Sequence, residues 1–251
     1  MALILSIVSG KGGVGKSVIA VNLAEVLAAD GRTVALVDAD LGQTACATLL
    51  NESPATSADF APKDRRACWH ACSSGVTLVQ GAAEPPPHDA GRRLVLRALD
   101  VQIEALEEVH DFILIDAPAG AEDVARWAME RADLSVLVLV DEPTSVADAY
   151  RLVKAAWHAD AGHAIGTVVN FAETEAHGRD VWHRFGLITR RFTGNGSFYL
   201  GSVPFSTDVR RSVARQVPFV REHESLAGSL RAIAAAAESH AEHARHGISL
   251  Q

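Results

Sequence analysis

A pattern typical of phosphate binding stands near the start of the chain. Residues 10–17 read Gly-Lys-Gly-Gly-Val-Gly-Lys-Ser and fit the phosphate-loop pattern G-x-x-x-x-G-K-[ST]. Its glycines let backbone N–H groups converge on phosphate oxygens, and they are Gly10, Gly12, Gly13 and Gly15. Lys16 is expected to reach the β- and γ-phosphates of a nucleotide, and the Ser17 hydroxyl is expected to bind Mg²⁺.

The loop lies where such chemistry needs it, between an expected strand and an expected helix. The apolar run at residues 2–8 precedes it, and apolar residues recur at helical spacing from Ile19 to a stop at Gly31. A helix that begins at the loop directs its positive end at the anion. Val14 and Val18 are expected to complete the nucleotide contacts of the loop.

Three aspartates follow apolar runs further along the chain. Asp38 and Asp40 come at the end of the run 33–38, and Asp116 ends the run 112–116. A lone aspartate at such a place most often caps a loop. Three of them at strand ends in a chain with a phosphate loop indicate oxygen ligands around a divalent cation.

The pattern of the whole chain predicts an α/β fold with one doubly wound, mostly parallel sheet and helices on both faces. Short apolar runs alternate with helical patterns, and the expected strands are residues 2–8, 33–38, 76–79, 112–116, 134–140, 165–170 and 198–203. Pro143 and Ser145, with Asp148 three residues later, are expected to begin a helix with a capping box. We expect one domain that contains the phosphate loop at residues 1–235 and a C-terminal tail at 236–251 that forms a fraying helix.

Composition narrows the classes of function. The chain has 251 residues, 48% of them hydrophobic, and 23 Lys and Arg against 31 Asp and Glu give a net charge of −8. This acidity argues against broad nucleic-acid binding, which needs a positive surface. Three cysteines suggest a reducing cytoplasm without disulfides. We expect a cytoplasmic protein, since residues 1–8 do not resemble a secretion signal and no apolar run reaches about 20 residues.

Lys11 is a second lysine that the phosphate-loop pattern does not require. With it, residues 11–17 read K-G-G-V-G-K-S and resemble the deviant Walker A loop of the MinD/ParA ATPases. The resemblance implies that Lys11 reaches across an ATP-bound homodimer to the partner's phosphates. It also implies ATP or ADP and Mg²⁺ as ligands, and slow ATP hydrolysis that is coupled to dimerisation.

Two further stretches support the resemblance. Residues 38–42 (D-A-D-L-G) are similar to the family's switch I, and residues 116–120 (D-A-P-A-G) to its Walker B and switch II segment. The resemblance implies that Asp38 supports the Mg²⁺ shell, Asp40 orients the attacking water and Asp116 holds a Mg²⁺-bound water. Asn170 and Pro204 match the family's adenine-pocket positions.

Three segments resemble the FlhG branch of the family, also called FleN or YlxH, which regulates flagellar number and placement. They are residues 142–150, 168–181 and 203–219. This branch implies a protein partner on the dimer face and control of flagella or of another positioned assembly. A second hypothesis is an ATP-gated antiactivator that sequesters a transcription regulator. A third is an ATPase that inserts a metal or an iron–sulfur cluster with Cys68 and Cys72.

Residues 68–72 and the C-terminal tail indicate whether a metal cluster or a membrane is expected as a partner. Relatives that carry clusters use C-x-C or C-x-x-C pairs, whereas Cys68 and Cys72 have three residues between them. We expect residues 68–72 to form a packed helix with both thiols as core fillers. Residues 230–251 have few bulky apolar residues and little basic charge, so strong membrane binding is not expected.

Overall fold

The central feature of the protein is an eight-stranded sheet. The computed structural model describes residues 1–41, 44–53, 68–81, 89–120 and 123–245, and within them the strand order is β3-β4-β2-β5-β1-β6-β7-β8. The strands are β1 (Leu3–Val8), β2 (Val34–Asp38), β3 (Trp69–Ala71), β4 (Thr77–Gln80), β5 (Phe112–Asp116), β6 (Leu134–Leu139), β7 (Ile165–Ala172) and β8 (Phe198–Pro204). Every pairing is parallel except that of the edge strand β3 with β4.

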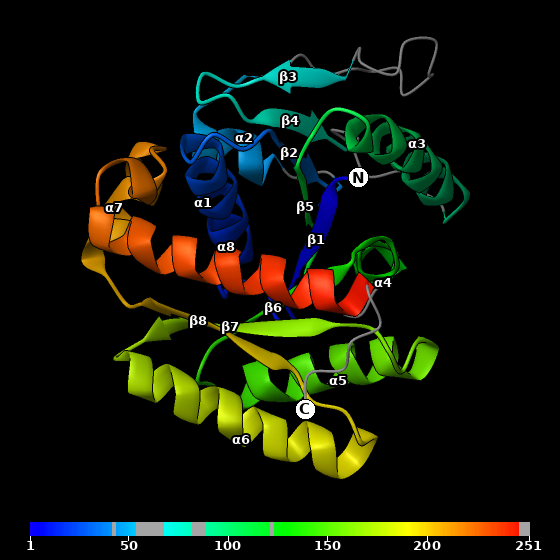
Figure 1. Cartoon of the computed structure of the whole chain (residues 1–251), viewed down its shortest axis with the longest axis vertical. Helices are drawn as coiled ribbons and strands as arrows, with labels where there is room; N and C mark the ends of the chain where they lie inside the picture. The colour runs from blue at the N-terminus through cyan, green and yellow to red at the C-terminus, as the bar shows by residue number, and fades with distance from the viewer. Residues whose placement is uncertain (42–43, 54–67, 82–88, 121–122, 246–251) are drawn as a thin grey trace.

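Helices cover both faces of this sheet. They are α1 (Lys16–Ala29), α2 (Ala45–Leu50), α3 (Asp89–Glu107), α4 (Asp123–Arg131), α5 (Pro143–Ala159), α6 (Glu175–Thr193), α7 (Thr207–Arg215), the 3₁₀ turn η1 (Phe219–Arg221) and α8 (Glu224–Arg245). Helices α1, α2 and α8 share one hydrophobic core with the sheet, and α3 to α6 share the other. In Figure 1, α8 crosses in front of the central strands and β3 forms the upper edge of the sheet. The expected doubly wound α/β fold is confirmed.

The near-continuous apolar runs explain why the central strands lie inside the molecule. All six residues of β1 are buried. Leu5 and Ile7 face the core that contains α1, while Ile4 and Val8 face the opposite core. Because successive side chains alternate between the two faces, both sets must be apolar.

Two local expectations are wrong. Residues 68–72 do not form a helix, because residues 69–71 form strand β3, which pairs with β4 through registers such as His70 with Leu78. The capping box at the start of α5 is also not formed. The helix begins at Pro143 after Glu142 without a side-chain cap, and the Ser145 hydroxyl instead accepts a hydrogen bond from the backbone N–H of Val140 at 3.4 Å.

The last helix passes through the expected domain boundary at residue 235. Helix α8 is continuous from Glu224 to Arg245, and Ala237 and Ala241 are buried against the core. The tail at 236–251 stays a prediction beyond Arg245, because residues 246–251 lie outside the described residues. In the described parts of the chain, every helix is too short or too polar to cross a membrane.

Candidate nucleotide-binding site

The phosphate loop connects the end of β1 to the first turn of α1. Gly13 and Gly15 have φ values of 79° and 89°, in the left-handed region that glycine enters without steric cost. A Cβ on Gly15 would lie 2.3 Å from Nδ2 of Asn170, whereas a Cβ on Gly12 or Gly13 would meet no atom within 4 Å. The loop is therefore packed on one side and open on the side where phosphates would lie.

A cleft of about 1030 Å³ opens in front of the loop. Its lining brings together residues from the loop, switch I and the segment after β5, among them Gly12, Gly13, Gly15, Lys16, Ser17, Val18, Asp40, Pro118 and Ala119. These segments are far apart in sequence, but the carboxyl ends of β1, β2 and β5 are neighbours in the sheet. The cleft thus lies where ligands bind in doubly wound folds.

Lys16 is held by a buried carboxylate. Its Nζ lies 2.8 Å from Oδ1 of Asp116 and 3.4 Å from Oγ of Ser17. The Lys16 and Asp116 side chains are 8% and 0% exposed. An ion pair this deeply buried compensates two charges that would otherwise be costly to bury. Phosphates that enter the cleft would compete with Asp116 for the ammonium group.

Asp38 completes an acidic group at the ends of β2 and β5. Its carboxylate accepts hydrogen bonds from the backbone N–H groups of Asp40 and Cys46, each at 3.2 Å. Burial, and secondly the neighbouring Asp116, raise the pKa of Asp38 to about 7. A divalent cation would remove this penalty, because it favours the charged carboxylate. The Ser17 hydroxyl and the two carboxylates are oxygen donors of the kind that Mg²⁺ prefers, so they fit this ion.

Cys46 also lies in this group, although its sequence context gave no reason to expect it. Its Sγ lies 3.5 Å from Oδ2 of Asp116, and ligand atoms of Asp38, Cys46 and Asp116 all lie within 4.8 Å of one another. Burial raises the pKa of the Cys46 thiol well above its usual range. The thiol is therefore neutral and fills space behind the carboxylates.

Lys11 lies outside the cleft of its own chain. Its Nζ contacts Oε2 of Glu142 at 2.6 Å and Oγ1 of Thr144 at 3.2 Å, at the start of α5. The Lys11 side chain is 39% exposed. The two lysines of the loop thus have separate places, Lys16 at the buried carboxylate of Asp116 and Lys11 at the surface.

Asn170 and Pro204 line a second, mostly apolar cavity of about 290 Å³ beside the loop. The amide of Asn170 donates to the backbone carbonyl of Val14 at 2.7 Å, so it also holds the loop in place. The sequence did not single out the aromatic and basic residues that complete this cavity, namely Phe171, Phe205, Arg210 and Phe219. A mostly apolar cavity next to the phosphate loop suits a purine base.

Gly10 has a different place from the other glycines. A Cβ there would lie 2.2 Å from the backbone of Asp148 and Ala149 in α5. The lack of a side chain lets the loop lie directly on this helix. The structure therefore gives Gly10 a packing role, and its contact with a phosphate stays a prediction.

Comparison with known proteins agrees with this geometry. The profile of the ParA family, described as "NUBPL iron-transfer P-loop NTPase", matches residues 1–238. The antiactivator FleN of Pseudomonas aeruginosa is 30% identical over 237 residues, which are 89% of this chain and 82% of FleN. The iron–sulfur cluster carrier protein of Deinococcus radiodurans is 32% identical over 90% of this chain and 66% of its own length.

A solved structure shows the same fold over nearly the whole chain. The cell division ATPase MinD of Pyrococcus furiosus superposes with a TM-score of 0.76 and 25% sequence identity, over 95% of this chain and 99% of MinD. Proteins of this family bind ATP and ADP with Mg²⁺ and hydrolyse ATP. The chain belongs to the ParA family of P-loop NTPases, as an ATPase of the MinD/ParA type and of its FlhG-like branch.

Proposed function

We propose that the protein is a switch that dimerises when it binds ATP and separates after hydrolysis. The observation that carries this proposal is the place of Lys11. It is a cation of the phosphate loop, yet its ammonium group lies at the exposed start of α5 and does not line its own nucleotide cleft. A second copy facing this surface would receive that charge at its own phosphates.

In this proposal each residue of the site has one task. Lys16 leaves Asp116 and binds the β- and γ-phosphates, and Asp40, which lines the cleft, orients the attacking water. Ser17, Asp38 and Asp116 would hold Mg²⁺, which would neutralise charge on the phosphates. Lys11 from the other copy stabilises charge that develops during phosphoryl transfer, as an arginine finger does. Catalysis is then positioning and electrostatics.

For the cellular role we propose control of the number or placement of flagella, or of another positioned assembly, through a protein partner on the dimer face. The similarity to the flagellum site-determining protein YlxH of Helicobacter pylori, 27% identical over 88% of this chain and 74% of YlxH, supports this role. The similarity to the antiactivator FleN supports the second candidate, an antiactivator that sequesters a transcription regulator. An antiactivator should still act when it is locked with ATP, whereas a switch that must cycle should fail.

The third candidate, transfer of an iron–sulfur cluster by Cys68 and Cys72, has support from the family description and from the Deinococcus relative. The geometry does not favour it. The extended strand β3 separates the two cysteines, which places their backbones about 13 Å apart at roughly 3.3 Å per residue. Iron analysis of the anaerobically purified protein tests it, and bound iron would support this candidate.

The proposed function is tested with the variant Asp40→Ala. We expect it to bind ATP and to form a dimer in light scattering. We expect its rate of ATP hydrolysis to fall at least about 100-fold, because the water loses its orienting carboxylate. Lys16→Ala is the control that should not bind ATP and should stay monomeric. Unchanged turnover in Asp40→Ala would contradict the role of Asp40, and a wild type that stays monomeric with ATP would contradict the switch. In flagellated host cells, the number of flagella then separates the first two candidates.

A further inference from the structure

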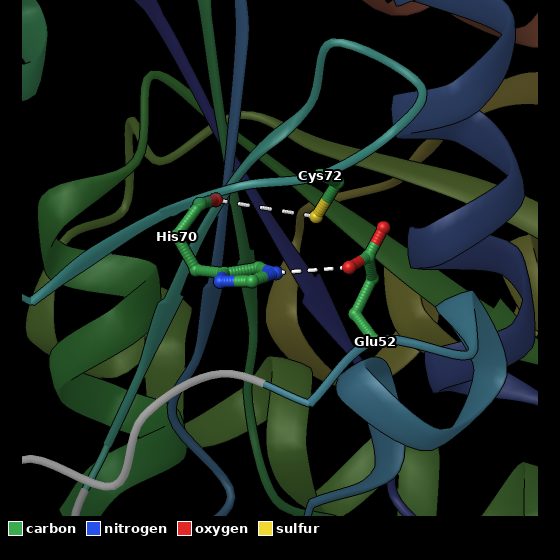
Figure 2. Close-up of side chains that lie close together, drawn as sticks. All are labelled: Glu52, His70 and Cys72. Atoms are coloured by element: carbon green, nitrogen blue, oxygen red, sulfur yellow. Dashed lines mark hydrogen bonds and ion pairs between the residues drawn. The ribbon is translucent and has the colours of Figure 1, made fainter.

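Three side chains that can bind a metal meet away from the nucleotide cleft. Figure 2 shows Glu52, His70 and Cys72 turned toward one another between β3 and the end of α2. Nε2 of His70 lies 2.9 Å from Oε2 of Glu52. One ligand atom from each of the three residues lies within 4.8 Å of the others.

Local structure fixes the direction of each side chain. His70 lies in β3, and Cys72 follows two residues later, so both point to the same side of the extended chain. Glu52 follows the left-handed residue Asn51, which ends α2. The backbone N–H of Ser73 donates to Oε1 of Glu52 at 2.8 Å, which leaves Oε2 directed at the histidine.

The surroundings of this cluster are rich in negative charge. Burial is the largest cause that raises the pKa of the Cys72 thiol to about 12, and the negative charges of Glu52 and Glu25 raise it further. Arg221 balances one of these charges through an ion pair of 2.7 Å with Oε2 of Glu25. Glu25 is 4% exposed, and its other oxygen has no hydrogen-bond partner among the described residues. A cation would therefore enter a favourable electrostatic environment.

We propose that Glu52, His70 and Cys72 form a site for a divalent transition metal, with Zn²⁺ as the ion that fits best. Thiolate, imidazole and carboxylate are ligands that Zn²⁺ binds in tetrahedral geometry, whereas Mg²⁺ takes oxygen ligands alone. Zn–S bonds of about 2.3 Å and Zn–N and Zn–O bonds of about 2.0 Å place tetrahedral ligands roughly 3.3–3.6 Å apart. Ligand atoms within 4.8 Å reach this geometry through small side-chain movements.

Metal binding here would fasten the edge of the sheet to α2. The ion would take the place of the hydrogen bond between Glu52 and His70, and the Cys72 proton would pass to solvent as the thiolate binds. The other end of α2 carries Cys46, whose backbone N–H contacts Asp38 in the nucleotide site. The fourth position of the ion would be open to water, and Cys68 is not part of the cluster.

The test is a titration of the full chain with Co²⁺, which replaces Zn²⁺ and reports its ligands by absorption. The protein is reduced, freed of metal with a chelator and kept in excess Mg²⁺, which occupies the nucleotide site. We expect one equivalent of Co²⁺ to bind with a thiolate charge-transfer band and tetrahedral d–d bands, and Zn²⁺ to remove both. Zn²⁺ should also raise the midpoint of thermal unfolding.

Matched variants decide which residues bind the ion. Cys72→Ser should lose the charge-transfer band, and His70→Gln and Glu52→Gln should weaken binding at least about 10-fold. His70 is only partly buried, so His70→Gln keeps the test valid if Cys72→Ser does not fold. Cys68→Ser and Cys46→Ser are the controls and should bind like the wild type. Absence of tight binding to the wild type, or loss of the band in either control, would overturn the proposal.

Discussion

Lys11 and Lys16 lie five residues apart in the phosphate loop, yet different carboxylates hold their ammonium groups. Asp116 binds Lys16 in the interior, and Glu142 binds Lys11 at the surface. A surface ion pair contributes little to stability, about 0–1 kcal/mol, so Lys11 can leave Glu142 at low cost. The buried pair of Lys16 can be opened only if another anion replaces Asp116.

The first prediction concerns Lys11→Ala. We expect the variant to bind ATP as a monomer with nearly the affinity of the wild type, because the Lys11 side chain does not line the cleft of its own chain. We expect it to lose the ATP-dependent dimer, because the charge delivered to the partner is gone. Calorimetry measures the binding and light scattering measures the dimer. Glu142→Gln is the matched control, since it removes the same ion pair but keeps the lysine. A Lys11→Ala protein that still dimerises with ATP would refute the role of Lys11.

The place of the phosphate loop between a strand and a helix could be predicted, because one short motif contains the loop. The three aspartates come from other segments, and their roles at a nucleotide stay predictions. The structure does bring Lys16, Asp38 and Asp116 together. Cys46 and Phe205 could not be predicted, because their neighbours come from distant segments. Nothing in the sequence around Cys46 states that its thiol will lie 3.5 Å from Asp116, which is 70 residues away.

At the scale of elements, the phosphate loop depends on α5 as well as on α1. The loop lies against the first turns of α5 at Gly10, and Glu142 just before the helix holds Lys11. Helix α5 has no side-chain cap at its start. It begins with Pro143 instead, whose ring fixes φ at a helical value and so favours the start of the helix at this residue. A shift of this helix would therefore move the N-terminal end of the loop.

The second prediction compares Gly10→Ala with Gly12→Ala. The new methyl group at residue 10 would lie 2.2 Å from the backbone of α5, so we expect the free energy of unfolding to fall by about 1–3 kcal/mol. At residue 12 no atom lies within 4 Å of the added carbon, so we expect a change within about 0.5 kcal/mol. Urea denaturation without nucleotide measures both. Equal stability of the two variants would show that the contact with α5 does not matter.

The sequence pattern at residues 68–72 predicted a helix, whereas residues 69–71 form strand β3. A strand of three residues is too short to display an alternating pattern. Its conformation is set by tertiary contacts, since β3 pairs with β4 and Nε1 of Trp69 donates to Oε1 of Gln102 in α3 at 2.9 Å. The long buried strands were predicted correctly because their apolar runs carry the information locally.

At the scale of the whole molecule, two half-buried histidines contribute to the pH dependence of stability. Burial lowers the pKa of His163 below 6.5, where its Nε2 contacts Oγ of Ser135 at 2.7 Å between β6 and α5. Burial also lowers the pKa of His240 in α8. In the unfolded chain both rings take up protons near pH 6.5, and in the folded protein they do so only at lower pH. The contribution of these two histidines to stability is therefore complete above that pH and falls as the pH drops below it, whereas Asp38, whose pKa is raised to about 7, contributes in the opposite direction.

The third prediction tests this with His163→Gln. We expect the free energy of unfolding of the wild type, measured relative to that of the variant, to fall between about pH 7.5 and pH 5.5, because the variant lacks one group that takes up a proton on unfolding. Asp38 is present in both proteins, so its opposite contribution cancels in this difference. Denaturation curves at several pH values give the comparison. His183→Gln is the control, since His183 is exposed on α6. Identical pH profiles for the wild type and His163→Gln would show that His163 does not contribute.

Helix α8 decides whether the molecule can bind a membrane by its C-terminal part. Its larger apolar side chains, such as Leu230 and Ile233, are buried in the core that it shares with α1 and the sheet. Further along, Ala237 and Ala241 are buried and His240 stacks on Phe198 with ring centroids 4.1 Å apart. Arg231 forms ion pairs with Asp30 and Glu224. The apolar face and this positive charge are thus already used inside the protein.

The last prediction follows from this packing. A lipid-binding helix needs a free apolar face and basic residues beside it, and burying alanine methyl groups gains little at roughly 25 cal/mol per Å². We therefore expect no ATP-dependent binding to anionic liposomes at neutral pH in co-sedimentation, with Asp40→Ala used to keep the ATP-bound dimer. Strong pelleting at neutral pH that is lost on deletion of residues 236–251 would contradict the prediction, because it would mean that the helix leaves the core to bind lipid.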